Sequence, residues 1–342
     1  MPELLICSHL EPEFIERVGR VSPDLTVHYR PDLLATPQYA ADHVGAPFER
    51  TAAQDQEWQE LLRRAEILFD FDYHHMESFK AHAESVKWIQ ASSAGIGQFV
   101  RRHRLDELGA TLTTAAGVHA RPLAEFVLWG MLAFTKNYPL ARQQQRQRRW
   151  QRFHNDDLEG KTLAIVGLGQ IGVEVAKLAQ LLGLRVIGSK RHVDGVSPQS
   201  LNVAELYPHK AFAEMLPRAD FVCLACPHTP ETEGMMDRRA LGAMKAGSVL
   251  INIGRGALVD ETALLHALRH GPLQGAVLDV AHQEPLPEDD PLWSLDNVII
   301  FPHSASTSRQ ENRRLTDLFC DNLARYLRGE PLKNVFDITR LY

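Results

Sequence analysis

Hydrophobic positions in residues 158–303 form short runs rich in β-branched residues, and stretches with helical periodicity separate these runs. Strands that alternate with helices predict a parallel, doubly wound sheet. The predicted strands are 162–166, 185–187, 221–225, 249–252, 276–278 and 298–301. The N-terminal part repeats the pattern more loosely, with candidate strands at 4–7, 25–29, 67–69 and 88–89. We therefore expect an α/β fold of two doubly wound domains, Rossmann-like and flavodoxin-like, with a cleft between them.

Two helical segments stand out from the rest of the pattern. Residues 120–135 are apolar nearly all round, which predicts a buried helix that links the two halves of the chain. Residues 309–327 are amphipathic, with Leu315, Phe319 and Leu323 on one stripe. This C-terminal helix must bury its stripe against one of the domains.

Composition and charge exclude several classes of protein. The chain has 342 residues, of which 44% are hydrophobic and 23% charged, as in ordinary globular proteins. The net charge is −6, and the basic residues are scattered except in 142–152, so we expect no nucleic-acid partner. The longest apolar run, 126–134, is too short to span a membrane, and the first residues lack the basic start of a signal peptide. We expect a cytoplasmic protein without a membrane partner.

Cys223 and Cys226 form a C-x-x-C sequence, which raises the question of metal or redox chemistry. They lie in a predicted buried strand that ends just before Pro227, and no second cysteine pair or suitably spaced histidine pair completes a zinc site. We interpret them as core thiols and expect no metal.

A dinucleotide fingerprint follows the first strand of the second domain. Gly167, Gly169 and Gly172 stand in a G-x-G-x-x-G sequence that leads into a helix, with Gln170 and Ile171 between the last two. The first glycine permits the tight turn, the second lets a pyrophosphate approach the backbone, and the third lets helix and strand pack closely. Amides at the start of the helix then hold the phosphates.

The end of the next strand indicates which dinucleotide is used. NAD enzymes place a carboxylate there to accept the ribose hydroxyls. This chain has Ser189, Lys190 and Arg191 instead, and two cations with a hydroxyl suit a 2′-phosphate. The alternative is a solvated basic loop. We expect NADP as the preferred cofactor, with NAD possible.

Three further segments end predicted strands of the same sheet, at the edge where open α/β folds bind ligands: 252–256, 279–285 and 301–305. They bring Arg255, Glu284 and His303 together. The order and spacing of these segments, with 227–232 (Pro-His-Thr-Pro-Glu-Thr), closely resemble the D-isomer-specific 2-hydroxyacid dehydrogenase family over about residues 86–305.

Reduction of a 2-keto acid requires groups that these three residues can supply. Arg255 can hold a substrate carboxylate and carbonyl in a fork that lysine cannot reproduce. His303 can donate a proton to the developing alkoxide, and a neighbouring Glu284 would favour its protonated form. Each residue alone has a structural explanation, as a turn arginine, a solvated glutamate or a strand-end histidine. As a spaced set they predict a catalytic centre.

The resemblance implies further roles. It assigns Asp279 to the nicotinamide carboxamide, with a strand-end helix cap as the alternative. It assigns the amides of Ala94, Gly95 and Ile96 to the substrate carboxylate, with a plain turn as the alternative. The remaining positions that it implies for the cofactor are Cys226, Pro227, Ile253, Gly254 and His303.

The resemblance also implies the domain organisation: a discontinuous substrate-binding domain of residues 1–119 and 306–342, and a dinucleotide-binding domain of residues 120–305. Within the latter, the segment 137–157 matches an arm through which family members dimerise, and Trp150 lies in it. A solvated basic helix is the alternative for this segment. We expect a homodimer.

The function that we expect is NAD(P)H-dependent reduction of a small 2-keto acid, such as glyoxylate or hydroxypyruvate, to the D-2-hydroxy acid. Formate is disfavoured, since formate dehydrogenases of the family carry glutamine where this chain has Glu284. Phenylpyruvate and phosphite remain alternative substrates. A dinucleotide-sensing corepressor-like protein that binds peptides is an alternative of another class.

Overall fold

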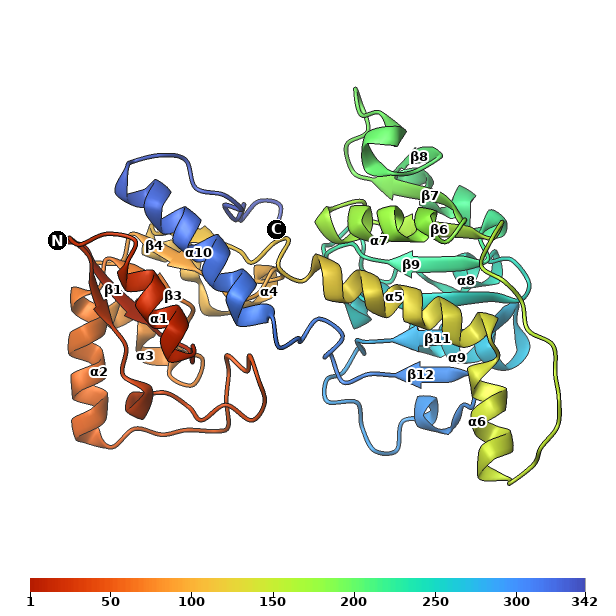
Figure 1. Ribbon diagram of the computed structural model, residues 1–342, viewed down its shortest axis with the longest axis horizontal. Coiled ribbons are helices and arrows are strands. Elements are labelled where there is room, and N and C mark those ends of the chain that lie inside the picture. Colours follow the sequence, from red (N-terminus) through yellow and green to blue (C-terminus); the bar gives the residue numbers. More distant parts are fainter. Residues whose placement is uncertain (342) are drawn as a thin grey trace. The chain divides into compact units, whose positions relative to one another are not determined.

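The computed structural model describes residues 1–341, and the chain divides into two compact units (Figure 1). The first unit contains Met1–His119 and the segment that starts at Thr307. The second unit is Ala120–Ser306. Each unit is an α/β domain with its own parallel sheet, so the predicted fold class is confirmed.

The first unit is built on a five-stranded parallel sheet in the order β2-β1-β3-β4-β5. Its strands are β1 (Glu3–Ile6), β2 (Thr26–His28), β3 (Ile67–Phe69), β4 (Trp88–Gln90) and β5 (Thr111–Thr113). The edge strand β5 is absent from the predicted strands, because Thr111–Thr113 is short and its run contains a single large apolar residue. Since all the strands are parallel, the loops that follow β1, β3 and β4 share one edge of the sheet.

Helices cover both faces of this sheet. They are α1 (Pro12–Gly19), α2 (Ala52–Arg64), α3 (Met76–His82), α4 (Gly97–His103) and α10 (Glu311–Leu327), with short 3-10 turns at Pro31–Leu33 and Leu105–Leu108. One buried cluster joins the sheet to α2, α3 and α4, and another joins it to α1 and α10. Figure 1 shows α10 alongside α1, where it buries the predicted stripe of Leu315, Phe319 and Leu323. The amphipathic C-terminal helix is therefore part of the N-terminal domain.

The second unit contains a seven-stranded parallel sheet in the order β12-β11-β10-β9-β6-β7-β8. Its strands are β6 (Thr162–Val166), β7 (Arg185–Lys190), β8 (Glu205–Pro208), β9 (Phe221–Leu224), β10 (Ser248–Asn252), β11 (Leu273–Leu278) and β12 (Val298–Ile300). The chain first adds strands on one side of β6 and then, from β9 onwards, on the other. Such a switch point leaves a crevice at the carboxyl ends of the strands, which is where open α/β sheets bind ligands.

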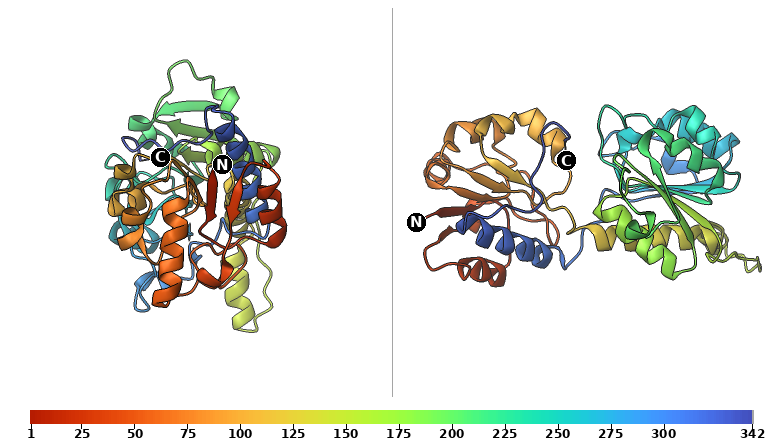
Figure 2. Two further views of the ribbon diagram at one scale, coloured as in Figure 1. Left: turned by 90° about the vertical axis from the view of Figure 1, so that its left-hand side faces the viewer. Right: turned by 90° about the horizontal axis from the view of Figure 1, so that it is seen from above.

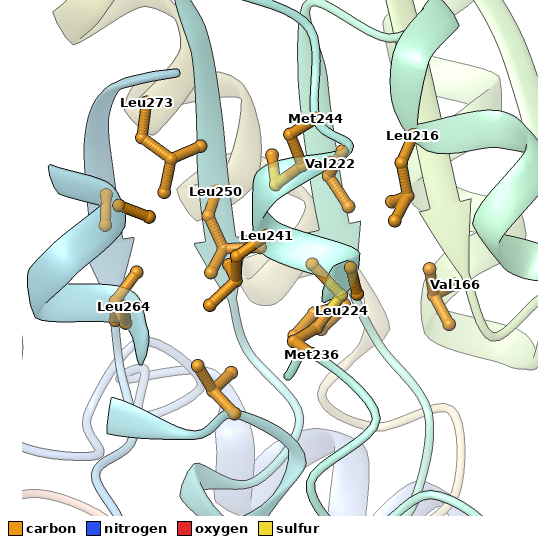
Figure 3. Close-up of a cluster of buried hydrophobic side chains, with 14 of the residues drawn as sticks. Val166, Leu216, Val222, Leu224, Met236, Leu241, Met244, Leu250, Leu264 and Leu273 are labelled. Atoms are coloured by element: carbon orange, nitrogen blue, oxygen red, sulfur yellow. The ribbon is translucent and has the colours of Figure 1, made fainter. Parts of the chain in front are cut away.

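Two layers of helices enclose this second sheet. The helices are α5 (Ala120–Thr135), α6 (Tyr138–Arg146), α7 (Gln170–Leu181), α8 (Arg238–Gly242) and α9 (Glu261–His270), with 3-10 segments at Pro198–Leu201, His209–Arg218, Gly256–Leu258 and Pro291–Ser294. The helices α5 and α7 pack on one face, as the right-hand view of Figure 2 shows, and α8 and α9 pack on the other. Figure 3 shows Val222, Leu224 and Leu250 of the strands against Leu241 of α8.

The helix α5 has the bounds predicted for the linking helix, and most of its side chains are buried. It contacts α7 extensively, so it belongs to the second unit. Within residues 1–341 no helix combines the length and the apolar character that a membrane crossing requires.

Candidate active site

The fingerprint loop between β6 and α7 leaves space where a phosphate group would have to approach. Gly167 has φ +106°, and a Cβ there would lie 2.6 Å from the backbone nitrogen of Cys226. A Cβ on Gly172 would lie 2.2 Å from the Gly167 carbonyl oxygen. A Cβ on Gly169, by contrast, would meet no atom within 4 Å. The first and third glycines are thus required by packing, and the second faces open space.

The start of α7 carries no side-chain cap. Its N-cap residue is Gly169, whereas α8 and α9 begin with Asp237 and Asp260, which accept hydrogen bonds from amides of their own first turns. The first-turn amides of a helix have no acceptor within the helix. The predicted residues Gln170 and Ile171 therefore present their amides at a helix end whose partial positive charge suits a phosphate.

The strand ends next to the fingerprint loop pack against it through their backbones. Gly167 contacts Cys226, and a Cβ on Gly254 would lie 2.9 Å from the Cys226 carbonyl oxygen. Cys226 and Ile253 are both 6% exposed. The structure thus brings three of the predicted cofactor segments, from β6, β9 and β10, into direct contact.

The strand β7 extends through Lys190, beyond its predicted end. Two of the predicted phosphate-binding residues, Ser189 and Lys190, therefore lie within the strand and not in the loop after it. Ser189 lies within the strand with its side chain fully buried, and its hydroxyl has no hydrogen-bond partner among the described residues. The expected contact between this hydroxyl and a cofactor phosphate therefore stays a prediction, and the hydroxyl is buried within the sheet in this structure. Lys190 donates from Nζ to the Leu168 carbonyl oxygen at 2.8 Å.

Arg191 has a partner that the sequence pattern did not indicate. No carboxylate lies next to it in the sequence, but the loop after β9 brings Glu231 to it. The Arg191 guanidinium donates to Glu231 Oε2 at 2.7 Å. A glutamate therefore stands beside the predicted phosphate-binding cations, and the sequence offered no signal for it because the two residues are forty positions apart.

Arg255 follows β10 in a loop that is fixed by its neighbours. The side chain of Asn252, the last residue of β10, donates to the Arg255 carbonyl oxygen at 2.9 Å and accepts from the Gly254 amide at 3.1 Å. The next glycine packs on the loop after β11, since a Cβ on Gly256 would lie 1.9 Å from the carbonyl carbon of Ala281. Asn252 and Gly256 were not among the predicted site residues, yet they position Arg255.

The predicted proton donor and its partner are hydrogen-bonded. His303 Nδ1 lies 2.7 Å from Glu284 Oε2, and the second oxygen of Glu284 accepts from the Ala281 amide at 3.1 Å. Their side chains are 45% and 39% exposed. With Nδ1 held by the carboxylate, Nε2 is the ring nitrogen that remains to face a substrate.

Asp279, at the end of β11, fixes the backbone that carries His303. Its side chain accepts from the amides of Ser304 and Ala305, each at 2.9 Å, and its own carbonyl oxygen accepts from the His303 amide at 2.8 Å. His303 itself has φ +53°. Asp279 thus anchors the loop after β12, and this loop is not the start of a helix, since α10 begins at Glu311.

The charges of the site act on one another. Burial lowers the pKa of Arg255, and the negative charges of Glu284 and Asp279 oppose this lowering. Burial works to raise the pKa of Glu284, but the hydrogen bond and charge of His303, together with the Ala281 amide and Arg255, leave the pKa below its ordinary value. Burial raises the pKa of Asp279. Glu284 is thus the carboxylate that stays ionised most readily.

In the first unit, the loop predicted to hold a substrate carboxylate follows β4. Ala94 is partly exposed and Gly95 exposed, whereas Ile96 is 3% exposed. The Gly95 amide donates to Ser93 Oγ at 3.3 Å. The tip of the loop is exposed enough to bind a ligand, whereas Ile96 anchors the loop in the core of the first unit.

Two other predicted features lie in the second unit. The arm, which comprises α6 and the segment up to residue 157, carries several exposed large apolar side chains, and Trp150 is 98% exposed. Cys223 and Cys226 are free thiols in the two buried clusters of the sheet, and burial raises the pKa of both.

The fold and this site define a class of protein, and comparison with known proteins identifies it. A family model described as the NAD binding domain of D-isomer specific 2-hydroxyacid dehydrogenases matches residues 128–305, more than half of the chain. The chain belongs to this family.

Individual relatives agree with this assignment. The chain is 33% identical over 264 residues to glyoxylate/hydroxypyruvate reductase B of Pectobacterium carotovorum, covering 75% of this chain and 81% of that protein. It is 33% identical over 261 residues to D-3-phosphoglycerate dehydrogenase of Methanocaldococcus jannaschii, covering 76% of this chain and 49% of that protein. The chain thus matches about half the length of the latter relative.

A solved structure extends the similarity to the whole chain. The D-isomer specific 2-hydroxyacid dehydrogenase of Xanthobacter autotrophicus Py2, solved in complex with NADPH and MES, has a TM-score of 0.79 and 27% sequence identity. The alignment covers 100% of this chain and 99% of that one.

Proposed function

We propose that this protein is a 2-keto acid reductase that prefers NADPH, accepts NADH less well, and forms the D-2-hydroxy acid. The observation that carries the proposal is the hydrogen-bonded pair of His303 and Glu284 at 2.7 Å, on strand ends of the sheet that also bears Arg255 and the fingerprint loop. A histidine with its carboxylate partner is a proton donor, and a partly buried arginine is a carboxylate-binding group.

The residues present fit a dinucleotide. The open space at Gly169 and the uncapped start of α7 suit a pyrophosphate, held by the amides of Gln170 and Ile171. We assign Cys226, Pro227, Ile253, Gly254 and Asp279 to the nicotinamide half. When bound, the dinucleotide supplies the hydride for reduction.

The NADPH preference rests on Lys190 and Arg191, which carry the positive charge at the end of β7. Arg191 is already paired with Glu231, so a 2′-phosphate has to compete with this carboxylate for the guanidinium. Replacing Lys190 and Arg191 by alanine is expected to raise the KM for NADPH about tenfold or more and to change the KM for NADH little. An equal rise for both cofactors would contradict the assignment.

The chemical roles follow from the contacts of each residue. Arg255, whose loop is braced by Asn252, orients the carboxylate and the carbonyl of the keto acid. His303 donates its proton from Nε2 to the carbonyl oxygen as the alkoxide develops, and Glu284 holds Nδ1 and favours the imidazolium. The amides of the loop 94–96 are assigned to the substrate carboxylate.

A homodimer formed through the arm 137–157 is part of the proposal. Trp150 is 98% exposed, and Tyr138, Leu140 and Phe153 of the same arm are also exposed. A cluster of exposed large apolar side chains on a projecting segment is typical of a protein interface. The four cysteines are free thiols, as is usual for the cytoplasm, where we expect the protein to act.

The test is the rate of NADPH oxidation, and separately of NADH oxidation, by the purified protein with glyoxylate, hydroxypyruvate, pyruvate and phenylpyruvate. Turnover of one or more of the keto acids, faster with NADPH, is the expected result. Turnover confined to phenylpyruvate would correct the substrate. NADP reduction with phosphite but no keto acid turnover, or cofactor binding without any turnover, would contradict the proposal.

A further inference from the structure

A hollow in the first unit contains polar groups that the proposed chemistry does not use. It lies at the ends of β1 and β3, and its lining includes Ser8, His43, Asp72 and Tyr73. The loop of Ala94, Gly95 and Ile96 follows β4, the neighbour of β3, so it belongs to the same edge of the sheet. The hollow and the proposed carboxylate loop are thus on one edge of one unit.

His43 is the residue in this hollow whose hydrogen bonding is incomplete. Its side chain is 7% exposed, and its Nδ1 lies 3.0 Å from Ser8 Oγ. Its other ring nitrogen, Nε2, is buried and has no hydrogen-bond partner among the described residues. A buried polar atom without a partner is uncommon, because the lost hydrogen bond to water is not replaced.

A buried carboxylate, Asp70, lies between His43 and the start of the carboxylate loop. Asp70 Oδ2 lies 4.0 Å from His43 Nδ1, and Asp70 Oδ1 accepts from the Tyr73 hydroxyl at 2.8 Å and from the Ser92 amide at 3.2 Å. Ser92 begins the loop that contains Ala94 to Ile96. One buried carboxylate therefore contacts both the start of this loop and the environment of His43.

The segment that carries His43 is held firmly in place. Asp42 accepts from the amides of Gln38, Val44 and Gly45 at 2.9, 3.2 and 2.9 Å. Further along, Arg50 makes two hydrogen bonds to Asp72, at 2.7 and 3.1 Å, and stacks over Trp58. Because the segment is fixed on both sides of His43, its imidazole is preorganised for a ligand.

We propose that His43 is a specificity-determining residue that hydrogen-bonds through Nε2 to a hydroxyl on C3 of the keto acid, which selects hydroxypyruvate-like substrates over pyruvate. This inference rests on the proposed function and names the substrate class of the same site.

A hydroxyl is the substituent that best fits these surroundings. It both donates and accepts, so it satisfies Nε2 in either tautomer of the ring. A methyl group would leave Nε2 without a partner. A phosphate or carboxylate would face Asp70 and Asp72, and the cation beside them, Arg50, is already paired with Asp72.

The test compares substrates that differ only in this hydroxyl. The ratio of kcat/KM for hydroxypyruvate to that for pyruvate is measured for the wild type, His43→Phe and His43→Gln. The phenylalanine keeps a planar ring beside Phe69 but has no hydrogen-bonding group, and the ratio is expected to fall about tenfold or more. The glutamine amide both donates and accepts, so it is expected to retain part of the preference.

A second readout does not depend on turnover. Calorimetry with the two products, D-glycerate and D-lactate, is expected to show about tenfold weaker D-glycerate binding in His43→Phe and unchanged D-lactate binding. If this variant does not fold, Ser8→Ala removes the partner of Nδ1 and is expected to lower the hydroxypyruvate preference two- to tenfold.

The outcomes separate this inference from the proposed function. An unchanged substrate ratio in a folded His43→Phe variant overturns the role of His43 and leaves the reductase intact. A wild-type preference for 3-phosphohydroxypyruvate that is lost in His43→Phe overturns the choice of a hydroxyl. A wild type that turns over no keto acid overturns the proposed function itself.

Discussion

Replacing Glu284 by glutamine tests the proton-donor pair without changing its shape. The carboxylate accepts from His303 Nδ1 at 2.7 Å, and its pKa is held below the ordinary value, so it is ionised wherever the enzyme is assayed. The substitution therefore removes a negative charge beside the imidazolium. The ring is then hydrogen-bonded to a neutral amide in place of a carboxylate, which weakens the pair that presents His303 to the substrate.

The expected size of this effect follows from the geometry of the pair. A hydrogen bond to a charged group contributes about 1.5–3 kcal/mol and a neutral one about 0.5–1.5 kcal/mol. The side chains are 45% and 39% exposed, so solvent screens the charge and the lower end applies, a difference of about 1 kcal/mol. A difference of about 1 kcal/mol corresponds to about a fivefold change in kcat/KM.

The assay is the pH profile of kcat/KM for keto acid reduction in the wild type and in Glu284→Gln. The ratio of wild-type to variant kcat/KM is expected to be about five at neutral pH and to shrink towards one as the pH falls through the lowered pKa of Glu284, because the protonated carboxyl resembles the amide. Glu288→Gln makes the same change of charge in the same exposed loop and is expected to give a ratio near one throughout. A ratio near one at neutral pH for Glu284→Gln would refute the role of this carboxylate.

Five other substitutions have defined outcomes. Arg255→Lys is expected to lower kcat/KM at least about a hundredfold in steady-state assays, because an ammonium cannot form the two parallel hydrogen bonds of a guanidinium; near-normal kinetics would remove Arg255 from the site. Gly172→Ala is expected to lower the melting temperature, since its Cβ would lie 2.2 Å from a carbonyl oxygen. Gly169→Ala is expected to leave the melting temperature unchanged, because its Cβ would meet no atom, and to weaken NADPH binding in a fluorescence titration. Glu231→Gln removes a carboxylate that competes with the 2′-phosphate for Arg191 and is expected to lower the KM for NADPH. A raised KM would contradict the phosphate site. Trp150→Ala is expected to raise the dissociation constant of the homodimer, measured by light scattering over a range of concentrations. A wild-type protein that is monomeric in the same measurement would contradict the proposed homodimer.

The sequence predicted well those parts of the fold where a hydrophobic period is long or a motif is bounded by glycines. The helix Ala120–Thr135 and the strand Thr162–Val166 have their predicted bounds, because an unbroken apolar pattern leaves one interpretation. The strands Thr111–Thr113 and Glu205–Pro208 were missed, since the former has a single large apolar residue and the latter has no buried residue and ends in an edge proline.

Prediction of the site was limited by register and by the course of loops. The strand β7 runs three residues beyond its predicted end and so includes Ser189, whose side chain is buried, and strand ends are where sequence patterns are least certain. The pairing of Arg191 with Glu231 and the position of His43 depend on loops without hydrophobic periodicity. By contrast, Glu284 and His303 follow successive strands of a parallel sheet, so their meeting at one edge could be expected from the order of the strands.

The most direct test of the central claim, that Arg255, Glu284 and His303 form a reduction centre, is the turnover number of His303→Ala with NADPH and the best keto acid. We expect a loss of about a hundredfold or more, because the proton donor is removed, while the NADPH dissociation constant measured on the same sample stays near the wild-type value. A His303→Ala enzyme that turns over at close to the wild-type rate would contradict the mechanism.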